Sequence, residues 1–84
     1  MIYQIEIDVM PHKNLLDPQG KAVANSMGRI GLPNVKDVRI GKHISLAVDA
    51  PDEASAYSIA ATACKNLLVN PVMEYFEIHI TAAV

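Results

Sequence analysis

Three histidines are the side chains of this 84-residue sequence best suited to hold a metal ion, but their spacing does not fit a metal site. His12, His43 and His79 lie far apart along the chain, and none has a second ligand at the i+4 or short-loop spacing that gathers groups around a metal. We therefore expect no metal on this chain.

The single cysteine, Cys64, is the thiol that could act as a nucleophile. Its sequence neighbours include Ala61, Ala63, Leu67 and Leu68, and a thiol in apolar surroundings usually acts as a small hydrophobic side chain. A chain with one cysteine forms no internal disulfide, which fits a reducing compartment. We expect no catalytic residue here.

The segment Asp17-Pro18-Gln19-Gly20-Lys21 places a glycine at the start of an expected helix. A glycine at that position would let an anion approach free backbone amides. No P-loop or paired-glycine dinucleotide pattern surrounds it, so the favoured interpretation is that Gly20 lets the first helical turn pack closely on another segment.

Arg39, Lys42 and His43 form a small basic cluster around an expected turn at Gly41. Isolated surface charges of this kind contribute little and usually belong to a solvated tip. The functional alternative is contact with an acidic partner, or with a phosphorylated substrate held by that partner.

A strand and a helix are the first elements that position these residues. From Tyr3 to Val9 apolar residues alternate with polar ones, which predicts a strand with one buried face. Asp17 followed by Pro18 is typical of a helix start, because aspartate caps free amides and proline loses no hydrogen bond there. The helix should end near Gly31, or a turn earlier at Gly28, and bury a stripe of Val23, Met27 and Ile30.

Residues 35–40 and 44–48 are predicted to form a hairpin. A two-residue loop would place polar groups on the apolar face, so a three-residue loop from Gly41 to His43 is preferred. This register pairs Ile40 with Ile44 and Val38 with Leu46, and it leaves Lys42 and His43 at an exposed tip.

A second helix and a last strand complete the pattern. The helix should start near residues 49–51 and end at Asn70, before Pro71, and the strand alternates over residues 75–81. The helix stripe expected to face the core is Ala56, Ile59, Ala60, Ala63 and Leu67.

The order βαββαβ predicts an α+β fold. Right-handed crossovers around a hairpin give a ferredoxin-like sandwich, in which a four-stranded antiparallel sheet carries both helices on one face. This fold hosts many functions, so it does not by itself indicate one.

Composition limits the class of protein. Eighty-four residues, 51% of them apolar, suffice for one domain over residues 1–84. Seven basic and nine acidic residues give a net charge of −2, which disfavours nucleic-acid binding. No segment resembles a signal peptide or a membrane span, and we expect a soluble, cytoplasmic protein.

The second helix lacks a charged outer face. Between Glu53 and Glu74 the only charged residue is Lys65, and the back of the helix carries small neutral side chains. Together with the thin core of so short a chain, this favours a subunit of an assembly, at least a homodimer, over a monomer.

Three segments resemble a known family. Residues 16–23 (LDPQGKAV), residues 35–42 with Val35 and DVRIGK, and residues 64–74 with Cys64 and LLVNPVME are similar to the small PurS subunit of phosphoribosylformylglycinamidine synthase. The resemblance runs over nearly the whole chain in the same order and spacing.

The resemblance implies a role within a complex that converts formylglycinamide ribonucleotide, ATP, glutamine and water to formylglycinamidine ribonucleotide, ADP, phosphate and glutamate. A glutaminase subunit (PurQ) releases ammonia, a large synthetase subunit (PurL) binds ATP, magnesium and the ribonucleotide, and the small subunit bridges them without catalytic residues or a cofactor. Charge reversal at Arg39 and Lys42 is expected to weaken assembly and to leave the isolated fold intact. The residues expected to face partner subunits are Asp17, Pro18, Gln19, Gly20, Lys21, Arg39, Lys42 and His43.

Two other functions fit the same element order. An ACT-like regulatory module would bind an amino acid where the first strand meets the first helix, a stretch that here offers Pro11 and Gly20 but few other cues. An enzyme of the acylphosphatase type needs an arginine in a glycine-containing first loop to cradle phosphate, and no arginine precedes Arg29.

Overall fold

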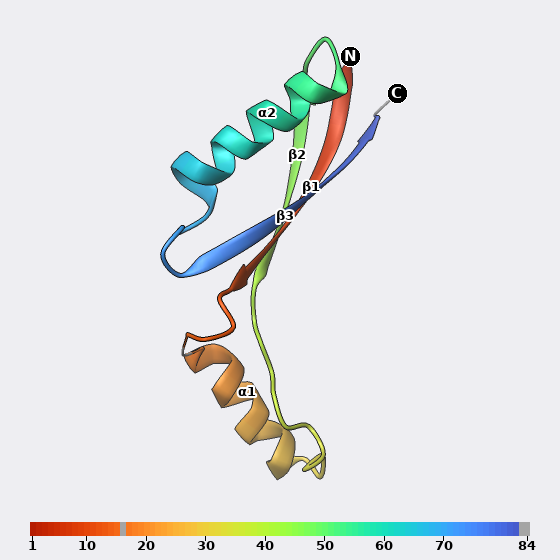
Figure 1. The fold of residues 1–84 in the computed structure, drawn as a ribbon. Helices are drawn as coiled ribbons and strands as arrows, with labels where there is room; N and C mark the ends of the chain where they lie inside the picture. The colour runs from red at the N-terminus through yellow and green to blue at the C-terminus, as the bar shows by residue number, and fades with distance from the viewer. Residues whose placement is uncertain (16, 83–84) are drawn as a thin grey trace.

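The computed structural model describes residues 1–15 and 17–82, and these form three strands and two helices (Figure 1). Strand β1 is Ile2–Pro11, β2 is Lys42–Asp49 and β3 is Glu74–Ala82. Helix α1 is Pro18–Arg29, and α2, Glu53–Ala63, continues into a π-helical turn, Cys64–Leu68. The strands pair antiparallel in the order β2-β1-β3, which confirms the α+β class.

The core lies between the sheet and α2. The predicted alternation of β1 is confirmed, because Ile5, Ile7 and Val9 on one face are fully buried. Small residues of α2, Ala56 and Ala60, let the helix backbone approach these side chains closely. We call this side of the sheet the helix face and the other side the open face.

The π-helical turn changes which residues of the second helix are buried. The α2 residues Ala56 and Ala60 are buried as predicted, but Ile59 is 46% and Leu67 is 82% exposed. A π-turn inserts an extra residue and rotates the chain that follows it. Cys64 and Val69 therefore fill the core where a regular α-helix would have presented Leu67.

Helix α1 does not pack on the sheet, so the prediction of a buried stripe is wrong. Val23 and Met27 are half-buried and Ile30 is 69% exposed, and within the described residues the core includes no side chain of α1. Instead, α1 and the chain that follows it to Gly41 form an arm (residues 18–41). The arm projects from one end of the sheet, and the molecule measures 51 × 28 × 14 Å (Figure 1).

The predicted hairpin does not form within the single chain. Residues 35–41 are extended but make no ladder with β2, and they continue straight into it (Figure 1). Lys42 and His43 are not at a tip, because they pair with Val9 and Asp8 as the first residues of β2. Since the chain does not reverse at this point, α1 cannot return over the sheet, and the fourth strand is missing from the described sheet.

None of the helices in the described residues is both long and apolar enough to cross a membrane.

Candidate assembly site at the neck of the arm

The predicted DPQG segment and the VRIGK segment meet where the arm leaves the sheet. We call this junction the neck (residues 11–15, 17–20 and 38–42). Asp17 caps α1, as predicted, by accepting a hydrogen bond from the Gly20 amide at 3.0 Å through Oδ1. Its other oxygen, Oδ2, accepts from the Ile40 amide at 2.9 Å. These two amides, with the nearby charge of Arg39, hold the pKa of Asp17 below its ordinary value.

Two glycines allow the backbones of the neck to touch. Gly20 is buried, and a Cβ atom there would overlap the carbonyl oxygen of Val38. A Cβ atom at Gly41 would overlap the carbonyl oxygen of Val9 and the sulfur of Met10. The packing interpretation of Gly20 is therefore confirmed, and its contact is the VRIGK segment.

Arg39 closes the neck from the other side. Its guanidinium donates to three consecutive carbonyl oxygens in the chain between β1 and α1: Pro11 at 2.6 Å, His12 at 2.7 Å and Lys13 at 3.0 Å. The His12 amide in turn donates to the Met73 carbonyl at 2.9 Å, so this loop is also tied to the start of β3. Arg39 is thus half-buried and held within its own chain.

Replacing Arg39 by lysine should lower the stability of the neck almost as much as replacing it by alanine. A lysine ammonium cannot reproduce the planar fork that reaches three carbonyls at once. We expect both variants to lose protection of the Ile40 amide in hydrogen-deuterium exchange measured by mass spectrometry. Protection equal to the parent in Arg39→Lys would contradict this role. The charge-reversal prediction is revised accordingly, because Arg39→Glu would disturb the isolated fold.

The expected basic cluster does not form. Lys42 points to the helix face, where its ammonium lies 3.4 Å from the Leu68 carbonyl and 3.8 Å from Glu74. His43 points to the open face, where Nδ1 lies 2.7 Å from Asp8 and Nε2 lies 2.9 Å from Glu6. Arg39, Lys42 and His43 therefore contact three different parts of the chain.

The His43 contacts make stability depend on pH. The two carboxylates, Asp8 first and Glu6 second, raise the pKa of His43 above its ordinary value of 6.5. The contribution of these contacts to the free energy of unfolding is fully present below the pKa of His43 in the unfolded chain. It is lost as the pH rises through the higher pKa of His43 in the folded chain. We expect the melting temperature to fall between pH 6 and pH 8.5, and His43→Gln to reduce that fall. If His12→Gln flattens the profile as much, the effect is not specific to His43.

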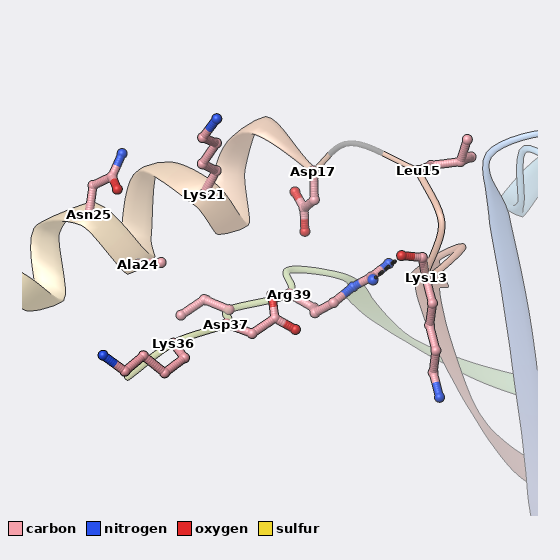
Figure 2. A pocket seen from close by; sticks show the side chains of 10 residues that line it. Lys13, Leu15, Asp17, Lys21, Ala24, Asn25, Lys36, Asp37 and Arg39 are labelled. Atoms are coloured by element: carbon pink, nitrogen blue, oxygen red, sulfur yellow. Dashed lines mark hydrogen bonds between the residues drawn. The ribbon is translucent and has the colours of Figure 1, made fainter. Parts of the chain in front are cut away.

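A cavity of about 430 Å³ lies between α1 and residues 36–39, and six charged side chains line it. Figure 2 shows that they do not converge: the ammonium groups of Lys13, Lys21 and Lys36 point in different directions, and Arg39 is turned toward the Lys13 carbonyl. The carboxylate of Asp17 is already bound to backbone amides. This arrangement is suited to contact with another chain rather than to holding a small anion.

The other candidates for chemistry are placed separately. Cys64 is fully buried, and burial raises the pKa of its thiol, so it is a core residue as predicted. In the described part of the chain no three His, Cys, Asp or Glu side chains gather as a metal site. Pro18, Gln19 and Lys21 form the exposed first turn of α1 beside the capped Asp17.

The sequence profile of PurS, described as phosphoribosylformylglycinamidine (FGAM) synthase, matches residues 4–82. The chain belongs to the PurS family. A PurS subunit of Synechocystis is 42% identical over 80 residues, covering 95% of this chain and 80% of the relative. One from Thermotoga maritima is 41% identical over 78 residues, covering 92% and 94%.

Solved PurS structures share the fold. A chain in the structure of PurLQS from Thermotoga maritima has 36% identity and a TM-score of 0.88, covering 96% of this chain and 99% of that one. Bacillus subtilis PurS has 30% identity and a TM-score of 0.87, covering 95% and 99%. The resemblance seen in the sequence is confirmed, and two of the motifs that carry it are the two sides of the neck.

Sequence reasoning missed the backbone groups of the neck. The Val38 carbonyl and the Ile40 amide are the partners of Gly20 and Asp17, and a sequence does not display such main-chain atoms. One signal was available in the sequence. A capping aspartate uses one carboxylate oxygen to accept from an amide of its own helix, so the second oxygen can bind another segment.

Proposed function

We propose that this chain is the small, non-catalytic subunit of phosphoribosylformylglycinamidine synthase, a glutamine-dependent, ATP-consuming ligase of purine biosynthesis in the cytoplasm. It bridges the glutaminase (PurQ) and the large synthetase subunit (PurL), which would hold ATP or ADP and magnesium. The observation that carries this proposal is the likeness, over nearly its full length, to a chain of the PurLQS structure. The neck also supports a non-catalytic role. The side chains of Asp17 and Arg39 form hydrogen bonds with the backbone of their own chain, so they are not free to bind a substrate.

Ammonia passed between two active sites must not reach bulk water, where it would be protonated. The subunits therefore have to meet over closed surfaces that exclude solvent. A small, rigid subunit with well-defined faces supplies part of such a wall without taking part in the chemistry.

Reconstitution of the complex tests this function. With glutamine as nitrogen source, leaving out the small subunit should abolish product formation, whereas ammonia supplied directly should still support the large subunit. Turnover of any substrate by the small subunit alone, or full glutamine-dependent activity without it, would overturn the proposal. Calorimetry with free amino acids addresses the ACT-like alternative, since a bridging subunit should release no heat.

The finer fold, a four-stranded ferredoxin-like sheet with two helices on one face, requires a second copy of the chain. Residues 35–40 are extended and outside the sheet, while β2 is an edge strand with Ile44, Leu46 and Val48 only half-buried on the helix face. We propose that two copies exchange their arms, so that residues 35–40 of one copy pair with β2 of its partner.

The uncovered face of α1 fits this exchange. Ala22, Val23, Met27 and Ile30 line an apolar hollow of about 250 Å³ on the helix. In the exchanged dimer this stripe would cover the half-buried residues of the partner's β2. Burial of such apolar surface at about 25 cal/mol per Å² is the main driving force that we expect for association.

The register of the exchange is the one that keeps apolar residues paired on the helix face. A two-fold axis beside Lys42 places residue 40 opposite residue 44, and residue 38 opposite residue 46, of the other copy. The same residue pairs were predicted for a hairpin, but here the two residues of each pair come from different copies of the chain. Exchange of this kind arises when a hinge loop straightens and the same contacts form between two copies.

Charge also favours an arm lying on a second copy. The arm, residues 18–41, carries four basic residues and one acidic residue, a net charge of +3. The rest of the chain carries three basic and eight acidic residues, a net charge of −5. Opposite potentials of this kind steer association and fix its orientation.

A cysteine pair tests the exchange directly. Val38→Cys with Leu46→Cys, in a Cys64→Ala background, should oxidise to a covalent dimer on a non-reducing gel, because paired residues of antiparallel strands are close enough for a disulfide. An intrachain disulfide would indicate a closed hairpin, and failure to crosslink would indicate neither arrangement; both outcomes contradict the exchange.

A further inference from the structure

Two arrangements of the chain satisfy the same strand pairs, and the hinge at residues 41–43 decides between them. If the hinge turns, the arm folds back on its own sheet as a closed hairpin. If the hinge stays extended, the arm is available to a second copy. The structure has the extended form, in which Lys42 and His43 belong to β2.

We propose that Lys42 and His43 are hinge residues, whose contacts on the two faces of the sheet hold the chain extended and so select exchange between two copies over a closed single chain. The proposal rests on the arm exchange described above, and it adds the residues that control it.

His43 holds the hinge on the open face. It is opposite Asp8 in the β1–β2 ladder, and its two ring nitrogens lie 2.7 Å from Asp8 and 2.9 Å from Glu6. Ser45 donates to the same Glu6 side chain at 2.9 Å, which fixes the carboxylate. In a three-residue turn, His43 would leave the ladder and lose its place opposite Asp8.

Lys42 holds the hinge on the helix face. It is opposite Val9 in the ladder, and its ammonium lies 3.4 Å from the carbonyl oxygen of Leu68, at the end of the π-helical turn, and 3.8 Å from Glu74. A cation beside the last carbonyls of a helix is favourable. Turning the hinge would therefore break contacts on both faces of the sheet together.

The hinge should respond to pH. On the open face His43 meets Glu6 and Asp8 of β1, while His79 of β3 lies 3.5 Å from Asp8 and Glu77 is opposite Asp8. In the exchanged dimer Asp37, Arg39 and His43 of the partner subunit would lie on the same face, with the two His43 side chains on either side of the two-fold axis. Protonated His43 donates to both carboxylates, whereas neutral His43 can donate to only one. The extended hinge is therefore favoured at low pH.

The cysteine-pair protein provides the assay. The full chain is refolded from urea under reducing conditions at several protein concentrations, oxidised, and separated into covalent dimer and intrachain-linked monomer. We expect the ratio of dimer to monomer to fall several-fold in His43→Gln and in Lys42→Met. The ratio should also fall from pH 6 to pH 8.5 in the parent, and less in His43→Gln.

Matched controls separate the outcomes. Lys65→Met removes the same charge outside the hinge, and His12→Gln removes a histidine ring that lies against Tyr75 and keeps the backbone carbonyl bound by Arg39; both should leave the ratio unchanged. If the parent forms no interchain disulfide, the exchange itself is wrong. If the parent forms it and the hinge variants keep the parent's ratio at every pH, the exchange stands and the role of Lys42 and His43 is overturned.

Discussion

Replacing Gly20 by alanine should separate the first turn of α1 from residues 38–40 and abolish the exchanged dimer, although alanine is the better helix former. The new Cβ atom would overlap the Val38 carbonyl, a backbone group that cannot rotate away as a side chain would. Overpacking of this kind costs about 3 kcal/mol. For a chain of this length we expect a fall in melting temperature of about 12–24 °C, with loss of glutamine-dependent activity in the reconstituted complex.

Gly28 provides the matched control. It lies in the same helix, its φ is not positive, and a Cβ atom there would meet nothing within 4 Å. Gly28→Ala should therefore stabilise the helix by up to about 1 kcal/mol. The same glycine-to-alanine substitution is therefore expected to lower the melting temperature at residue 20 and to raise it at residue 28. Equal melting temperatures for Gly20→Ala and Gly28→Ala would show that the neck does not need its close backbone contact.

A glutamate in the apolar stripe of α1 should convert the dimer to a monomer. Met27→Glu would bury two unpaired carboxylates, one per copy, and each buried charge without a partner costs several kcal/mol. Since each 1.4 kcal/mol is tenfold in affinity, we expect the dimer dissociation constant to rise by at least about 100-fold. Sedimentation equilibrium at several concentrations measures this directly.

Asn25→Glu adds the same charge at an exposed position of α1 and should leave the dimer intact. Far-UV circular dichroism of Met27→Glu is needed beside the sedimentation data, to show that the separated chains keep their strands and helices. A Met27→Glu protein that remains a dimer with the affinity of Asn25→Glu would rule out α1 as part of the interface.

The elements with a clear local signal were predicted correctly. The alternation over residues 3–9 fixed one face of β1 in the core, and Asp17 with Pro18 marked the start of α1. Gly31 marks its end, with a positive φ of 87°. Each of these depends on neighbours within a few residues, so the sequence alone is sufficient.

The errors concern partners that are distant or belong to another chain. The stripe of α1 was recognised as apolar, but nothing in a sequence says whether its cover is in the same molecule. Leu67 was misplaced because a π-turn has no sequence signature that would reveal the extra residue. The hydrogen bonds of Arg39 were not predicted, because they go to carbonyl oxygens that every residue possesses.

That use of main-chain atoms determines how the neck can vary. Arg39 binds the carbonyls of residues 11–13 and Asp17 binds two amides. These contacts of the neck therefore do not depend on which side chains residues 12 and 13 carry. A library randomised at His12 and Lys13 should yield mostly functional variants, whereas one randomised at Asp17 and Arg39 should yield few. New surface properties can therefore be introduced beside this joint without rebuilding it.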